Sequence, residues 1–195
     1  FQGEKRADFQ LAMMGRHNVE NAAAVAALCL GLGLAVDEIN SAFKSFQGIK
    51  RRQEVVGVKN GVTVLDDFAH HPTAIRLTLE AVKEAYPGQR LWAVFEPRSA
   101  TSRRKVFEQE FPDSFLPADR VVFGGVFAPD KIKEEDRLDP ERVVGLIRQK
   151  GGDANFIAEV DDIVAFIAEN AESGDVVLVM SSGGFGGIHQ KILDR

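Results

Sequence analysis

Residues 66–73 (DDFAHHPT) hold the densest set of side chains that could do chemistry: two carboxylates and two of the four histidines in the chain. The apolar residues 62–65 before them predict a strand, and Pro72 suits the first turn of a helix, where a missing N–H costs no hydrogen bond. We therefore expect these polar side chains to cluster in a strand-to-helix corner. Open α/β sheets bind ligands at such corners.

The spacing alone allows three interpretations of this corner. Asp66, Asp67, His70 and His71 offer the carboxylate and imidazole ligands that zinc and manganese accept. They could equally serve catalysis without a metal, since a histidine changes its charge near neutral pH. In a structural interpretation, Asp67 caps the following helix and one of the histidines accepts a backbone hydrogen bond.

A second polar set lies at the start of a nearly all-apolar helix that begins near residue 15. His17, Asn18 and Asn21 share its first turn, because side chains three and four apart on a helix are neighbours. An amide there can read the edge of a base. The alternative is that Asn18 is only an N-cap and His17 a surface residue. Apolar residues on every face of this helix predict that it is buried.

Three adjacent cations at residues 50–52 lead into a predicted strand at 55–59. Asn60 and Gly61 are typical of a type I′ turn, so this strand should pair antiparallel with residues 62–65. The hairpin returns the chain to its starting end, and it therefore brings Arg51 and Arg52 near the two aspartates. The alternative is that the three cations form a solvated linker.

Two further loops follow predicted parallel strands. After residues 91–95, three arginines (Arg98, Arg103 and Arg104) could clamp a carboxylate or phosphate through paired hydrogen bonds, or form a solvated helix start. After residues 176–180, the glycine-rich residues 181–187 precede a helix, where backbone N–H groups can gather around an anion. The chain has neither GxGxxG nor GxxxxGK[ST], so the sequence gives little support to dinucleotide binding or a phosphate loop of its own.

Strand and helix patterns alternate from residue 55 to the end. They predict an α/β fold with a Rossmann-like, mixed but mostly parallel sheet flanked by helices, to which the hairpin adds an antiparallel strand. We assign residues 1–49 to the end of a preceding domain and residues 50–195 to this α/β domain.

Composition sets the broad class. The chain has 195 residues, 45% of them hydrophobic, and a net charge of −5 with both signs interspersed, so no basic face indicates nucleic acid or a membrane surface. Cys29 is the single cysteine, which excludes internal disulfides and favours a reducing, cytoplasmic location. No long apolar span or signal peptide is visible, and the start without methionine suggests a piece of a longer protein.

Five motifs taken in order resemble the Mur ligase family of peptidoglycan biosynthesis. They are GRHNxxN, GIKRRQE, DDFAHHPT, FEPRSATSRR and MSSGGFGG. The resemblance covers residues 15 to 190 and implies the end of the family's central ATPase domain followed by its whole C-terminal domain. The forms FEPRSATSRR and SSGGFGGIHQK are most similar to the murein-recycling members. Alanine-adding members carry a PHR-type sequence where this chain has Pro97-Arg98-Ser99, which favours an amine larger than alanine.

The resemblance implies that ATP phosphorylates the carboxylate of UDP-N-acetylmuramate and that the tripeptide L-Ala-γ-D-Glu-meso-diaminopimelate attacks the acyl phosphate through its amine. The residues implied to contact ATP are His17, Asn18 and Asn21 at the adenine, Arg52 at the phosphates and Asp67 at the ribose. His70 is implied to lie at the reacting centre. The residues implied to contact the peptide are Arg98, Arg103 and Ser182. Mg²⁺ is implied with its ligands in the upstream domains of the same polypeptide, so this piece alone should be inactive.

Three alternatives stay open. The first is a UDP-N-acetylmuramate:L-alanine ligase of the same family. The second is a metal-dependent hydrolase that uses the aspartates and histidines of residues 66–71. The third is a non-catalytic nucleotide-binding module.

Overall fold

The computed structural model describes residues 4–46 and 48–195 and divides the chain into two compact units, Phe1–Lys50 and Arg51–Arg195. The first unit contains the helices α1 (Arg16–Gly31) and α2 (Val36–Ser45). The ring of Phe9 packs edge-on against Phe43 of α2, with centroids 5.7 Å apart. In the part of the chain that the structure describes, no helix is long and apolar enough to cross a membrane.

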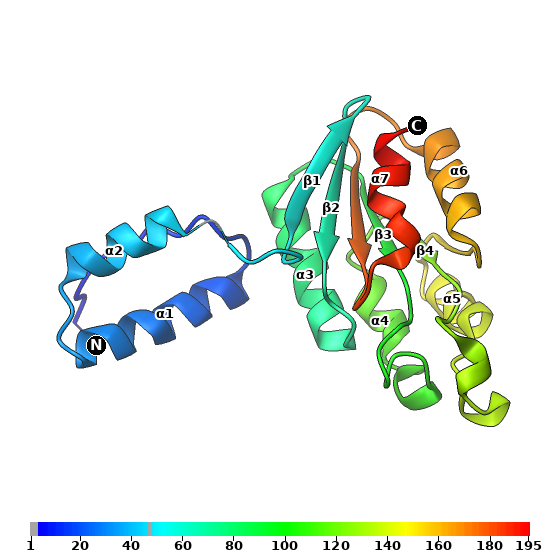
Figure 1. Cartoon of the computed structure of the whole chain (residues 1–195), viewed down its shortest axis with the longest axis horizontal. Coiled ribbons are helices and arrows are strands. Elements are labelled where there is room, and N and C mark those ends of the chain that lie inside the picture. The colour runs from blue at the N-terminus through cyan, green and yellow to red at the C-terminus, as the bar shows by residue number, and fades with distance from the viewer. Residues whose placement is uncertain (1–3, 47) are drawn as a thin grey trace. The chain divides into compact units, whose positions relative to one another are not determined.

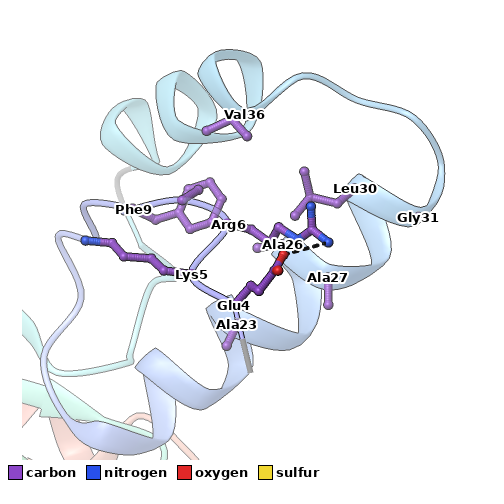
Figure 2. A pocket seen from close by; sticks show the side chains of 11 residues that line it. Glu4, Lys5, Arg6, Phe9, Ala23, Ala26, Ala27, Leu30, Gly31 and Val36 are labelled. Atoms are coloured by element: carbon purple, nitrogen blue, oxygen red, sulfur yellow. Dashed lines mark ion pairs between the residues drawn. The ribbon is translucent and has the colours of Figure 1, made fainter. Parts of the chain in front are cut away.

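The prediction that the first helix is buried is wrong for this unit. Ala26 is its only buried residue, whereas 65% of Leu28 and 57% of Val19 are exposed. Its apolar residues lie on every face, and in the described part of the unit α2 and the segment around residues 4–9 pack along one side of it. These elements line an open pocket of about 810 Å³ with mostly apolar walls (Figure 2).

A six-stranded sheet forms the centre of the second unit. Its strands are β1 (Glu54–Lys59), β2 (Val62–Asp67), β3 (Leu91–Phe95), β4 (Arg120–Phe123), β5 (Ala154–Phe156) and β6 (Val176–Met180). The order across the sheet is β1-β2-β6-β3-β4-β5, with β1 antiparallel to β2 and all other pairs parallel. This arrangement confirms the predicted α/β fold with one antiparallel strand.

Helices cover both faces of the sheet (Figure 1). On one face, α3 (Pro72–Ala85), α4 (Phe111–Phe115) and α5 (Pro140–Gln149) bury an apolar core that includes Leu79 and Phe95. On the other face, α6 (Val160–Asn170) and α7 (Ile188–Leu193) bury a second core around Trp92 and Ile163. Short 3₁₀ turns lie at Lys105–Phe107, Pro129–Lys131, Glu134–Asp136 and Phe185–Gly187.

Local sequence accounts for the elements that border the predicted corner. Asn60 and Gly61 have φ angles of 52° and 80°, the positive pair that a type I′ hairpin requires. Pro72 is the first residue of α3, where its missing N–H has no partner to lose. Ile75 and Leu79, one turn apart, are fully buried and fix the helix against the sheet.

The helices that follow the neighbouring strands β3 and β6 lie on opposite faces of the sheet. The strand β3 leads to α4 on one face, whereas its neighbour β6 leads to α7 on the opposite face. Ligands of open α/β sheets bind outside the carboxyl ends of the strands at such a reversal. We therefore expect a binding site at the loops after β3 and β6.

Candidate functional site

Asp67 is the most buried polar residue of the corner, with 2% of its surface exposed. Its Oδ1 accepts a hydrogen bond from the N–H of Ala69 at 2.7 Å, and its Oδ2 accepts one from the N–H of Gln53 at 2.9 Å. Burial raises the pKa of Asp67, and these two bonds and the charge of Arg52 oppose that rise only in part. Asp67 therefore ties the start of β1 to the end of β2 instead of capping α3.

Asp66 meets different partners from its neighbour. Its Oδ2 lies 3.2 Å from Nε of Arg51, and its Oδ1 lies 3.3 Å from Nε2 of His189, close enough for an ion pair but not aligned for a hydrogen bond. Burial by itself would raise the pKa of Asp66, but the contacts with His189 and Arg51 outweigh it and lower the pKa.

The two histidines of the corner have separate surroundings. Nδ1 of His70 lies 3.0 Å from the carbonyl oxygen of Phe68. His71 is the N-cap of α3, where its Nδ1 accepts a hydrogen bond from the N–H of Thr73 at 3.2 Å, as the structural interpretation expected of one histidine. Among residues 4–46 and 48–195, no group of three or more histidines, cysteines and acidic residues is placed to hold a metal ion. The geometry of the corner therefore gives no support to the metal-dependent hydrolase.

Arg98 lies in the space between the loops that follow β3 and β6. Its guanidinium carbon is 3.6 Å from the centroid of the Phe127 ring, and its Nη1 is 3.6 Å from Oε1 of Glu96. On the side of the β6 loop, a Cβ added to Gly183 would lie only 1.9 Å from Nε of Arg98. Gly183 thus allows the arginine to pass close to the backbone.

Glu96 and Ser181 connect the two loops beneath Arg98. Each directly follows its strand and is buried. The Ser181 hydroxyl donates to Oε2 of Glu96 at 2.5 Å and accepts from the N–H of Gly183 at 2.9 Å. The loops after β3 and β6 are therefore held in one fixed relation.

A pocket of about 470 Å³ opens next to these loops, at the carboxyl ends of β3, β4 and β5. Its walls are mostly apolar, but three charged residues also line it; the residues that matter here are Glu96, Phe127, Arg137, Phe156, Glu159 and Phe185. Within the described chain, the side chains of Arg137 and Glu159 have no hydrogen-bond or ion-pair partner. An apolar pocket with a few converging polar groups is typical of a small-molecule site.

The structure brings Arg98 and Arg103 together at this place. Arg98 stacks on the Phe127 ring, and Nη1 of Arg103 donates to the Phe127 carbonyl oxygen at 3.2 Å. Nε of Arg103 is buried without a partner in the described chain. Ser182 precedes Gly183, which Arg98 overlies, and it is half-buried. The three residues predicted to contact the peptide therefore lie in two adjacent loops, Arg98 and Arg103 after β3 and Ser182 after β6.

The remaining predicted contacts lie elsewhere. Arg52 is exposed, close enough to Asp67 for its charge to act on that carboxyl. In the first unit, Nδ2 of Asn18 donates to the carbonyl oxygen of Met14 at 2.7 Å, and Gly15, not Asn18, is the N-cap of α1. Asn21 is exposed and His17 half-buried on the same helix.

Sequence reasoning missed several residues that shape the site, among them Glu96, His189 and the pocket residues Arg137 and Glu159. Glu96 could have been found, because the first residue after a buried parallel strand commonly faces the site. His189 gave no such signal: it lies on α7, and only the folded chain brings it to Asp66.

Comparison with known proteins adds the family context. Residues 51–183 match the family model described as Mur ligase, glutamate ligase domain. A UDP-N-acetylmuramate-L-alanine ligase of Caldanaerobacter subterraneus subsp. tengcongensis is 37% identical over 195 residues, which are 100% of this chain and 42% of that protein. A UDP-N-acetylmuramate-L-alanyl-gamma-D-glutamyl-meso-2,6-diaminoheptandioate ligase of Haemophilus influenzae is 39% identical over 194 residues, 99% of this chain and 41% of that protein.

A solved structure agrees with these relatives. The murein peptide ligase from Psychrobacter arcticus 273-4 shares 35% identity and a TM-score of 0.73, covering 100% of this chain and 40% of that one. The chain thus spans about two fifths of the length of the relatives it matches. Alanine-adding and tripeptide-adding relatives occur at similar identity, so identity alone does not choose between the two amines.

Proposed function

This chain belongs to the Mur ligase family, and we propose that it is the C-terminal part of an ATP-dependent ligase that joins UDP-N-acetylmuramate to L-Ala-γ-D-Glu-meso-diaminopimelate. The proposed setting is peptidoglycan recycling in the cytoplasm, with the upstream domains supplied by the same polypeptide. The observation that carries the choice of amine is the 470 Å³ pocket beside Arg98.

Size and charge of the pocket favour a peptide over a single amino acid. Pockets for ligands of several hundred daltons measure roughly 300–1,000 Å³, so a lone alanine would leave most of this space unfilled. Arg137 and Glu159 lie among the lining residues without partners in the described chain, and they can pair with a carboxylate and an ammonium group of a longer ligand. The tripeptide carries both groups beyond its reacting amine.

The proposed reaction forms an amide in two steps. ATP transfers its γ-phosphoryl group to the muramoyl carboxylate, and the lone pair of the peptide amine then attacks the acyl carbon. The C–O bond to phosphate breaks, phosphate leaves with the electron pair, and the nitrogen gives up a proton. Arg98, Arg103 and Ser182 are proposed to hold the peptide so that its nitrogen faces the acyl carbon, and His70 to orient the reacting groups.

The nucleotide contacts remain as the family resemblance gives them. His17, Asn18 and Asn21 are proposed for the adenine, Arg52 for the phosphates and Asp67 for the ribose. An exposed amide at Asn21 and an exposed guanidinium at Arg52 suit these roles. Both oxygens of Asp67 already accept a backbone N–H, so the ribose would use their remaining lone pairs.

Magnesium is proposed for the whole ligase, where it would neutralise phosphate charge. The described residues offer no group of three or more metal-ligating side chains. We propose that most of the magnesium ligands lie in the upstream domains of the same polypeptide.

A binding titration tests the peptide pocket on the chain itself. When unlabelled tripeptide is added to the ¹⁵N-labelled chain, we expect amide shifts at Gly125, Phe127 and Gly183, which border the pocket and Arg98. Gly88 and Gly151, in open turns away from these loops, serve as internal references. Alanine at the same concentration should leave Gly125 unmoved. Tripeptide shifts that spare the amides of Gly125, Phe127 and Gly183 would contradict the proposal.

A further inference from the structure

The side chain of Arg51 connects the end of β2 to the loop after β6. Its Nε lies 3.2 Å from Oδ2 of Asp66, and its guanidinium carbon lies 5.2 Å from the centroid of the Phe68 ring. From the same guanidinium, Nη2 donates to the carbonyl oxygens of Ser181 at 2.6 Å and Gly183 at 2.7 Å. One planar group thus contacts two segments that lie more than a hundred residues apart in the sequence.

The backbone of Arg51 is itself held in an unusual conformation. Its φ angle of 60° is in the left-handed region, which residues with a side chain rarely adopt. The N–H of Arg51 donates to Oε2 of Glu54 at 2.8 Å, and its carbonyl oxygen accepts from the N–H of Phe68 at 2.9 Å. A strained conformation that its surroundings fix so fully is often retained for a functional reason. Here it aims the side chain along the ends of β2 and β6.

The hydrogen bonds of Arg51 hold the two residues that flank Ser182. Arg51 takes the carbonyl oxygens of Ser181 and Gly183, and the N–H of Gly183 is taken by the Ser181 hydroxyl. Across the described residues, neither the N–H nor the hydroxyl of Ser182 has a hydrogen-bond partner. The loop is therefore anchored on both sides of Ser182, while the polar groups of Ser182 stay available.

We propose that Arg51 is a positioning residue that holds residues 181–183 in the shape that presents Ser182 to the amine substrate. Asp66 orients the guanidinium, and His189 lies on the opposite oxygen of Asp66. The role of Ser182 in binding the amine rests on the proposed function. The anchoring of the loop by Arg51 does not depend on it. A lysine at this position keeps the charge but cannot reproduce the planar fork that reaches the carboxylate and both carbonyls together.

Hydrogen exchange on the 195-residue chain tests the anchoring without any ligand. In Arg51→Lys we expect the amide of Gly183 to exchange about tenfold faster, because the loss of bonds to a charged donor lowers the cost of local opening. Arg76→Lys is the matched control: among the described residues this exposed arginine pairs with Glu80 alone, one turn along α3, and its replacement should leave the exchange of Gly183 unchanged. Unchanged exchange at Gly183 in a folded Arg51→Lys protein overturns the proposal.

Two further measurements separate this inference from the proposed function. Asp66→Asn removes the charge that orients Arg51 and should raise the exchange of Gly183 in the same direction, so a poorly folded Arg51→Lys variant would not leave the anchor untested. In the full-length ligase, Arg51→Lys should raise the KM for the tripeptide and leave the KM for ATP unchanged. Faster exchange with an unchanged tripeptide KM would keep the anchor and refute the peptide role of Ser182.

Discussion

Replacing Gly183 with alanine should raise the KM of the full-length ligase for its amine substrate by about tenfold to a hundredfold, with ATP kinetics unchanged. The added Cβ would lie 1.9 Å from Nε and 2.2 Å from Cδ of Arg98, so the side chain must leave its place against Phe127. The expected loss corresponds to one charge-assisted hydrogen bond, about 1.5–3 kcal/mol.

The fold should tolerate this substitution. Gly183 does not have a left-handed backbone, and the group that must give way is a flexible side chain and not backbone. The alanine also reduces the freedom of the unfolded chain, which usually favours the folded state slightly. The melting temperature of the chain should therefore change little.

Gly184→Ala is the matched control for Gly183→Ala. Gly184 is the next residue, it has a φ of −79°, and an added Cβ would have nothing within 4 Å. Steady-state kinetics with varied tripeptide and varied ATP should therefore separate the two variants. Equal KM values for the tripeptide in both variants would show that the position of Arg98 does not matter for the amine.

Asp67→Asn should destabilise the chain by about 1–3 kcal/mol and, in the ligase, weaken ATP binding. One oxygen of the amide can still accept a backbone N–H, but its NH₂ group would face the N–H of Gln53 or Ala69 and leave that donor unpaired. Asp136→Asn is a suitable control, because Asp136 is exposed and its side chain pairs with Arg104 alone in the part of the chain that the structure describes. Urea unfolding measures the stability. An ATP KM that stays unchanged in the folded variant would limit Asp67 to its structural role.

The pH dependence of the same comparison follows from the raised pKa of Asp67. Burial favours the protonated form of Asp67 in the folded state. The stability that this preference contributes is fully present below a pH of 3.8, the ordinary pKa of an aspartate, and is lost as the pH rises through the higher folded-state pKa. The wild-type chain should therefore gain stability relative to Asp67→Asn as the pH falls through this window. A difference that stays constant across it would contradict the burial argument.

Local patterns were enough to predict the fold of the second unit. Alternating apolar strands and amphipathic helices gave the order of elements, and Asn60-Gly61 gave the hairpin. The pattern also predicted the helix α1, but the prediction that this helix is buried was wrong. Burial depends on what packs against a helix, and this unit covers only part of the surface of α1.

The site was predictable only as a set of candidate residues. The motifs identified Asp67 and Arg98, but not that Asp67 would bind two backbone N–H groups or that Arg98 would lie between Gly183 and Phe127. The motifs gave a role to Arg52 but none to Arg51 beside it. The contacts of Arg51 with Ser181 and Gly183 depend on the pairing of β2 with β6, which no local pattern encodes.

The most direct test of the proposed function compares two amines in one assay. Phosphate release by the full-length ligase is measured with ATP and UDP-N-acetylmuramate fixed, while either L-Ala-γ-D-Glu-meso-diaminopimelate or L-alanine is varied. A peptide that fills the 470 Å³ pocket and pairs with its free charges should have a kcat/KM at least about a hundredfold higher than alanine, equivalent to about 2.7 kcal/mol. An alanine kcat/KM equal to or above that of the tripeptide would contradict the account and make this chain part of an alanine-adding ligase.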